Sequence, residues 1–211
     1  TQNQAFSALL FLYRHILKKD YDLRDTVVRA RRTRYVPVVL SRAEIDAVVA
    51  RMQDPHRLAV QLLYGCGLRR AECLSLRVQC LNFDQGIVTV HDGKGKKDRT
   101  VPLPAALRAP LKEQLERVAQ QHEQDLKAGY HGVFLPGALD GKYKNAAREY
   151  IWQWLFPARM LTYVPDTGER RRYHMQGSEL QKALRAAVRE ARIPKRVTCH
   201  TFRHCFATHL L

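Results

Sequence analysis

The short stretch His200-Thr-Phe-Arg203-His204, near the end of the sequence, is its most informative part. Each helical residue turns the chain by about 100°, so His200 and Arg203 lie roughly 60° apart and can face one ligand. His204 follows His200 by one turn, which is also a spacing of zinc sites. No Glu follows His200 and no third ligand is evident, which disfavours zinc. A histidine packed in the core is the other interpretation of His200.

A second segment, Gly67-Leu-Arg69-Arg-Ala-Glu72, lies far upstream. Gly67 permits a sharp turn that places Arg69 at a helix start. Glu72 follows one turn later and is placed to hold the Arg69 guanidinium. Taken alone, the pattern is better explained as an ordinary Arg–Glu pair on a helix.

A third segment, Asp92-Gly-Lys94-Gly-Lys96-Lys97-Asp98-Arg99, contains a lysine between two glycines. On a hairpin tip, Lys94 can swing toward a phosphate group. A solvated basic turn is the alternative, and the presence of Lys96 and Lys97 leaves the choice open.

The charge of the chain indicates a polyanionic partner. Its 211 residues include 36 Lys and Arg against 20 Asp and Glu, a formal net charge of +16. Positive charges in this excess repel one another, and proteins that carry them commonly bind nucleic acid, which neutralises the charge. An ordinary basic surface is the alternative. The clusters around Arg32 and Arg34 and around Arg171 and Arg172 suit phosphate, because a planar guanidinium binds two oxygens at once.

The cysteine pattern predicts a reducing, cytoplasmic location. The five cysteines include no C-x-x-C pair, and an odd number argues against a disulfide framework. The sequence has neither a signal peptide nor an apolar run long enough to cross a membrane.

The hydrophobic pattern predicts an α+β fold that is mainly helical, with one small antiparallel sheet of three strands at 81–83, 87–91 and 99–103. Pro102 predicts a sheet edge or a strand end. The helices expected from spacing and capping signals are an amphipathic one over 1–19, one that begins with a capping box at Ser41-Arg-Ala-Glu44, a long one over about 104–127, one that carries Trp152 and Trp154, and one capped at Ser178.

The order of the three polar segments is more specific than any one of them. Gly-Leu-Arg-x-x-Glu, then Gly-Lys-Gly-x-Lys, then His-Thr-x-Arg-His resembles the tyrosine recombinase family over roughly residues 36–211. The resemblance implies that 1–26 ends an N-terminal DNA-clamping domain, that 27–40 is a basic linker, and that 41–211 is an incomplete catalytic domain.

The resemblance also implies roles for the site residues. Arg69 and Arg203 would bind the non-bridging oxygens of the scissile phosphate, and Lys94 would protonate the leaving 5′ oxygen. His200 would bond the phosphate and assist proton transfer, with Glu72 and His204 in support. The attacking Tyr would lie beyond Leu211, so the chain is expected to bind DNA without cutting it. No metal or cofactor is implied.

Residues 143–174 resemble the insert of integron integrases, an extra helix and hairpin that grips unpaired bases of a folded single-stranded hairpin. The expected DNA contacts, besides Arg32, Arg34, Lys96 and Lys97, are Trp152, Trp154, Arg171, Arg172, Tyr173 and His174. Aromatic faces stack on unpaired bases, but we expect at least two of Tyr150, Trp152 and Phe156 to be core residues. Tyr173-His174 stands where the subgroup commonly has two histidines, and Glu149-Tyr150 stands where it has Glu-Trp.

Three alternatives remain open from the sequence. The first is another tyrosine recombinase, of the phage integrase or chromosome-dimer resolution type. The second is a DNA-binding remnant without catalysis, and the third is a zinc-dependent enzyme. The resemblance further implies duplex recombination sites as partners and a tetramer on DNA for the intact protein, and it implies no membrane partner.

Overall fold

The computed structural model describes residues 2–19, 30, 36–91, 95, 97–137 and 139–210. The predictions for Arg32, Arg34, Lys94 and Lys96 therefore lie outside the described residues. The chain divides into two compact units, Thr1–Val36 and Pro37–Leu211, which are described separately.

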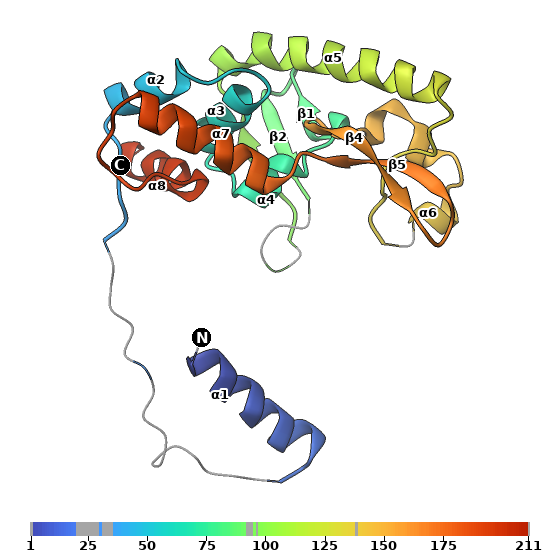
Figure 1. Cartoon of the computed structure of the whole chain (residues 1–211), viewed down its shortest axis with the longest axis horizontal. Helices are drawn as coiled ribbons and strands as arrows, with labels where there is room; N and C mark the ends of the chain where they lie inside the picture. Colours follow the sequence, from blue (N-terminus) through green and yellow to red (C-terminus); the bar gives the residue numbers. More distant parts are fainter. Residues whose placement is uncertain are drawn as a thin grey trace. The chain divides into compact units, whose positions relative to one another are not determined.

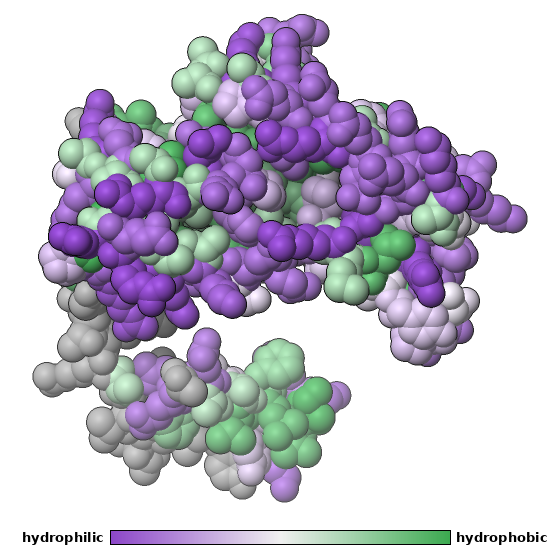
Figure 2. Space-filling model, turned by 45° about the horizontal axis from the view of Figure 1, so that its top comes forward, coloured by the Kyte–Doolittle hydropathy of each residue, from purple (hydrophilic) through white to green (hydrophobic). Residues whose placement is uncertain are grey.

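The described residues of the first unit form a helical segment, with α1 over Gln2–Phe11 continuing into the π-helical turn η1 over Leu12–Ile16. The predicted helix over 1–19 is therefore present but shorter. Neither α1 nor η1 has a buried residue within the described structure. Figure 2 shows apolar side chains gathered on this segment, and the exposed ones are Leu9, Phe11, Leu12, Ile16 and Leu17.

Five helices form one side of the second unit (Figure 1): α2 (Arg42–Val49), α3 (His56–Gly65), α4 (Arg70–Leu74), α7 (Gly177–Glu190) and α8 (Cys199–His209). Helix α3 contacts the other four. Its buried residues are Leu58, Ala59, Val60, Leu62 and Leu63, and they include consecutive positions, so more than one side of the helix is covered. A helix that is apolar over most of its surface belongs in an interior, so α3 is the element around which the others pack.

The capping signals are partly confirmed. At α2, Ser41 Oγ accepts from the Glu44 N–H at 3.2 Å, and Glu44 Oε2 accepts from the Ser41 N–H at 2.8 Å, which is the predicted capping box. The prediction for Ser178 is wrong: α7 begins at Gly177, and its N-cap Gln176 makes no side-chain cap.

The three-stranded sheet forms as predicted, from β1 (Leu81–Asn82), β2 (Ile87–Val90) and β3 (Arg99–Pro102). The strands are antiparallel in the order β1-β2-β3. Pro102 is the last residue of the edge strand β3, where its missing N–H costs no ladder bond. Val88 and Val90 of β2 point into the core.

After the 3-10 turn η3 (Ala105–Leu107), helix α5 (Arg108–Lys127) extends along both sheets (Figure 1). Two buried polar side chains of α5 fasten it. Gln114 Nε2 donates to the Leu155 carbonyl at 2.9 Å, and Asp125 pairs with Arg172 at 2.6 Å. Both bonds therefore fasten the helix to residues of the segment that follows it in sequence.

The segment after α6 (Leu139–Lys142) corrects the predicted helix around Trp152 and Trp154. It forms two 3-10 turns, η4 (Ala146–Arg148) and η5 (Tyr150–Trp152), after which the chain is extended. The Leu155 N–H donates to the Leu76 carbonyl at 2.8 Å, and the Val78 N–H donates to the Gln153 carbonyl at 3.0 Å. These backbone groups pair with residues 76–78 between α4 and the turn η2 (Val78–Cys80) rather than one helical turn back, so a helix cannot form.

A second antiparallel sheet follows, from β4 (Pro157–Val164) and β5 (Glu169–His174). The prediction of a single sheet is therefore incomplete, although the integron-type resemblance implied a hairpin here. The hairpin has its own small core, made by Tyr130, Val133 and Trp154. The main core, by contrast, joins α2, α3, α4, α7, α8 and β2, with members such as Ile45, Leu62, Leu74, Val88, Leu184 and Phe202.

Candidate functional site

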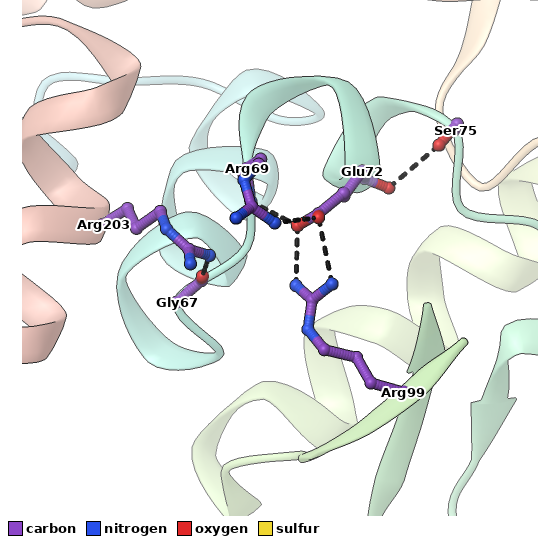
Figure 3. A network of polar contacts seen from close by, with 6 residues as sticks. All are labelled: Gly67, Arg69, Glu72, Ser75, Arg99 and Arg203. Atoms are coloured by element: carbon purple, nitrogen blue, oxygen red, sulfur yellow. Dashed lines mark hydrogen bonds and ion pairs between the residues drawn. The ribbon is translucent and has the colours of Figure 1, made fainter. Parts of the chain in front are cut away.

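The turn between α3 and α4 is shaped by Gly67. Its φ of +59° lies in the left-handed region, and a Cβ at this position would lie 2.3 Å from Cδ1 of Phe206 on α8. A side chain therefore fits neither the backbone nor the space. The Gly67 carbonyl accepts a hydrogen bond from Nη1 of Arg203 (Figure 3). This turn thus holds α8 close and anchors one of the predicted phosphate ligands.

Glu72 binds two arginines from two elements (Figure 3). Its Oε1 accepts from Arg69 Nη1 at 2.6 Å and its Oε2 from the Arg69 N–H at 2.8 Å. Arg99, the first residue of β3, donates to the same two oxygens at 3.0 and 2.7 Å. Only 7% of Glu72 is exposed. Burial raises the pKa of this carboxyl, but the bonds from Arg99 and Arg69 outweigh it and hold the pKa at about 2.

Helix α8 places His200 and Arg203 near Arg69. Burial lowers the pKa of Arg203, and the nearby charge of Arg69 lowers it further. The pKa of His200 is also lowered, first by burial and then by His204, Arg203 and Arg69. The rings of His200 and His204 are 4.4 Å apart and edge-on. Because the cations disfavour one another's charged forms, the site is arranged to receive an anion.

The hairpin that carries the predicted lysine is described only at its base. Lys94 and Lys96 are outside the described residues, and Lys97 is exposed. His91 Nδ1 and Asp98 Oδ2 lie 2.7 Å apart across the base. The next residue, Arg99, pairs with Glu72. Because Glu72 also binds Arg69, the base of the hairpin is joined to Arg69 through this carboxylate.

Two of the predicted DNA contacts are structural residues instead. Arg172 is 5% exposed and forms a two-bond ion pair with Asp125, at 2.6 Å for each bond. Trp154 is 7% exposed, donates from its indole N–H to the Arg172 carbonyl at 3.1 Å, and lies 3.7 Å below the guanidinium of Arg77. Both side chains are buried and bonded beside the β4–β5 hairpin, which leaves little of either to contact DNA.

The other predicted contacts in this segment are more accessible. Trp152 is half-buried, and Arg171 pairs with Asp140 at 2.6 Å and with Glu169 at 2.7 Å. Tyr173 is 37% exposed and stacks on His174, with ring centroids 4.2 Å apart. Phe156 is fully buried, as expected for a core aromatic, and the Tyr150 hydroxyl donates to the Leu115 carbonyl at 2.9 Å.

Arg99 is the site residue that the sequence analysis missed. A pairing over 27 positions gives no local spacing signal. Two features could have indicated this contact. A buried carboxylate with one arginine partner still has acceptor capacity for a second donor. Arg99 is the first residue of the predicted third strand, which ends the hairpin that follows this segment. Metal ligands form no group of three or more within the described residues. No described helix is long and apolar enough to span a membrane.

Comparison with known proteins agrees with this arrangement. The phage integrase family profile matches residues 39–211. An integrase/recombinase of Escherichia coli is 42% identical over 211 residues, which is 100% of this chain and 63% of that protein. The tyrosine recombinase XerA of Pyrococcus furiosus is 31% identical over 164 residues, which is 78% of this chain and 43% of that protein.

The fold is that of recombinase structures. The crystal structure of the XerH site-specific recombinase bound to its difH substrate aligns with a TM-score of 0.59 and 21% identity, over 100% of this chain and 54% of that one. This chain thus spans less than two thirds of each of these three proteins. Since the family profile covers most of the sequence and the Escherichia coli relative covers all of it, the chain belongs to the phage integrase family.

Proposed function

We propose that the protein takes part in site-specific DNA recombination and that Arg69, Arg203 and His200 bind the scissile phosphate. The observation that carries the proposal is the convergence of these three groups from the start of α4 and from α8, where Arg69 and Arg203 both lower the pKa of His200 and Arg69 lowers the pKa of Arg203. A phosphodiester that gains negative charge in its transition state is stabilised by cations fixed in this way.

The proposed chemistry needs no metal. A tyrosine oxygen attacks phosphorus, the bond to the 5′ oxygen breaks, and a 3′-phosphotyrosine forms. Lys94 gives its proton to the departing 5′ oxygen, while Arg69 and Arg203 hold the non-bridging oxygens. Glu72 orients Arg69, and His204 supports His200. All nine tyrosines of the sequence precede His200, so we propose that residues 1–211 alone bind DNA without cutting it.

Cleavage of a labelled DNA substrate tests this chemistry. Residues 1–211 should bind and yield no covalent adduct, whereas a polypeptide continued through a downstream tyrosine should yield one. Arg203→Ala should abolish the adduct and EDTA should not. An adduct that disappears with EDTA would contradict the metal-free mechanism.

We further propose an integron-type substrate, a folded single strand with unpaired bases. The support is the exposed aromatic surface of residues 143–174, which includes Tyr143, Tyr163 and Tyr173. Residues 1–26 and 27–40 would be the end of a DNA-clamping domain and its linker, and the intact protein would act as a cytoplasmic tetramer on DNA. The second candidate, a Xer-type recombinase acting on duplex sites, is favoured by the names of several relatives.

Tyr173 separates the two substrates. Deleting residues 143–174 would remove Phe156 from the core, so a point variant is the cleaner probe. Tyr173→Ala should weaken binding to a hairpin with unpaired bases by about five- to a hundredfold, the value of one stacked base. Tyr173→Phe keeps the ring and should bind normally. Equal losses on a fully paired duplex would favour the Xer-type alternative.

A further inference from the structure

A pocket opens beside His200. It has a volume of about 390 Å³ and lies between α4, α7 and the start of α8, with Arg70, Gln181, Arg185, Cys199 and His200 in its wall. No described acidic residue lines it. His200 is therefore shared between this pocket, which we call the α7–α8 pocket, and the cation cluster around Arg69 and Arg203.

The α7–α8 pocket offers hydrogen-bond donors that nothing in the described structure uses. The guanidinium groups of Arg70 and Arg185, both on exposed residues, make no hydrogen bond or ion pair with any described residue. Gln181 accepts from the Cys199 N–H through Oε1 at 3.2 Å. This bond fixes the amide orientation, because a backbone N–H needs an acceptor. The buried Nε2 group of Gln181 then has no partner among the described residues.

Arg69 and Arg70 are neighbours in sequence but serve different places. Arg69 binds Glu72, whereas Arg70 lies against the start of α7. A Cβ on Gly177 would lie 2.9 Å from Nε of Arg70 and 3.2 Å from Cζ. Burial raises the pKa of the Cys199 thiol, and Arg70 is near enough to oppose that rise. The glycine thus leaves the space in which the Arg70 side chain reaches the beginning of α8.

We infer that the α7–α8 pocket binds a second DNA phosphodiester, next to the scissile one on the same strand, with Arg70 and Arg185 as its ligands. The inference rests on the proposed function. Two unpaired guanidinium groups and a free amide donor at a helix N-terminus suit a phosphate. Phosphates follow one another closely along a strand, at about 3.4 Å of helix axis, so two adjoining sites that share His200 can hold consecutive phosphates. Together they fix the direction in which the strand crosses the site.

The salt dependence of DNA binding tests this assignment. Each phosphate contact adds about 0.9 to the slope of log K against log salt concentration on duplex DNA. The double variant Arg70→Gln/Arg185→Gln should flatten the slope of the 211-residue protein by about 0.9 in total, because both side chains hold one phosphate. Adding Arg203→Gln should flatten the slope further, by less than about 0.9, because Arg69 still holds the scissile phosphate. Arg70→Lys/Arg185→Lys keeps the charge and should keep the slope.

Arg189→Gln is the matched control, because Arg189 is an exposed arginine on the same helix outside the pocket. It should leave the slope almost unchanged. If it flattens the slope as much as the double variant does, or if the double variant has no effect, the second phosphate site does not exist. An effect of Arg203→Gln without an effect of the double variant would overturn this inference alone. Binding that ignores salt in every variant would overturn the proposed function as well.

Discussion

Glu72 is the residue on which the geometry of the cation cluster depends. Its carboxylate is buried and binds Arg69 and Arg99 together. Glu72→Gln keeps the shape but removes the charge, and we expect it to lower the free energy of unfolding by about 1.5–3 kcal/mol at pH 7, the value of hydrogen bonds to a charged group. The control is Glu190→Gln, at an exposed position of α7, which should change little.

The effect of Glu72→Gln should also depend on pH. The folded-state pKa of Glu72 is about 2, below its ordinary value of 4.5. A lowered pKa means that the stabilisation is present above pH 4.5 and is lost as pH falls toward 2. Urea unfolding of the wild type and the variant at neutral and at acid pH measures this, and the difference between them should shrink in acid. A constant difference would contradict the role of the charge.

Gly67 combines a backbone requirement with a packing requirement. Gly67→Ala should lower the free energy of unfolding by about 1–2 kcal/mol for the left-handed backbone and by about 1–3 kcal/mol more for the clash with Phe206. Gly129→Ala is the control, because Gly129 has a φ of +73° and no atom within 4 Å of an added Cβ. Equal losses in the two variants, measured by chemical denaturation, would mean that the contact with Phe206 is unimportant.

At the scale of single residues, contacts between residues close in sequence were predictable from their spacing, and contacts between distant residues were not. The pairing of Arg69 with Glu72 followed from their separation by one helical turn. The pairing of Glu72 with Arg99 could not be read from spacing, because it depends on the register of β3. The burial of Arg172 was missed for the same reason, since its partner Asp125 lies on α5, 47 positions away.

At the scale of elements, the ion pair between Arg172 and Asp125 holds the β4–β5 hairpin to α5. Arg172→Met should lower the free energy of unfolding by about 3–5 kcal/mol, because it leaves a buried carboxylate unpaired. The double variant Arg172→Met/Asp125→Leu should recover most of the loss. Arg170→Met, at an exposed position on the same strand, is the control. A double variant as unstable as the single one would show that the ion pair itself is not the cause.

Elements with strong local signals were predicted well, and the hairpin segment was not. The capping box at Ser41 and the turns between the first three strands each depend on a few consecutive residues. The aromatic run around Trp152 and Trp154 has no such signal, and its backbone groups bind residues 76–78. Distant pairing therefore overrode the helical pattern that the local sequence suggested.

At the scale of the whole molecule, the net charge of +16 opposes the compact state. A polyanion that binds the folded protein should relieve this repulsion. Duplex DNA at about 100 times its Kd should stabilise the protein by about 2.7 kcal/mol, which raises Tm by about 5–10 °C for a chain of this size. Sodium chloride at equal ionic strength is the control, measured by thermal scanning. An equal rise with the salt would mean that screening alone explains the effect.

The fold class followed from the sequence, because periodicity and turn residues mark helices and strands directly. The domain bounds expected at residues 26 and 40 stay a prediction. That Arg69, His200 and Arg203 lie close together could be expected only from the family resemblance, because their proximity depends on the packing of α3, α4 and α8.

The bond between Arg203 and the Gly67 carbonyl has a consequence for affinity. Freezing a free arginine side chain costs about 2 kcal/mol of rotamer entropy, and in this protein that loss occurs during folding. A ligand therefore meets a guanidinium already aimed, and preorganisation of this kind strengthens binding. Any ligand that draws Arg203 away from the carbonyl exchanges one acceptor for another, so the measured affinity is the difference between the two.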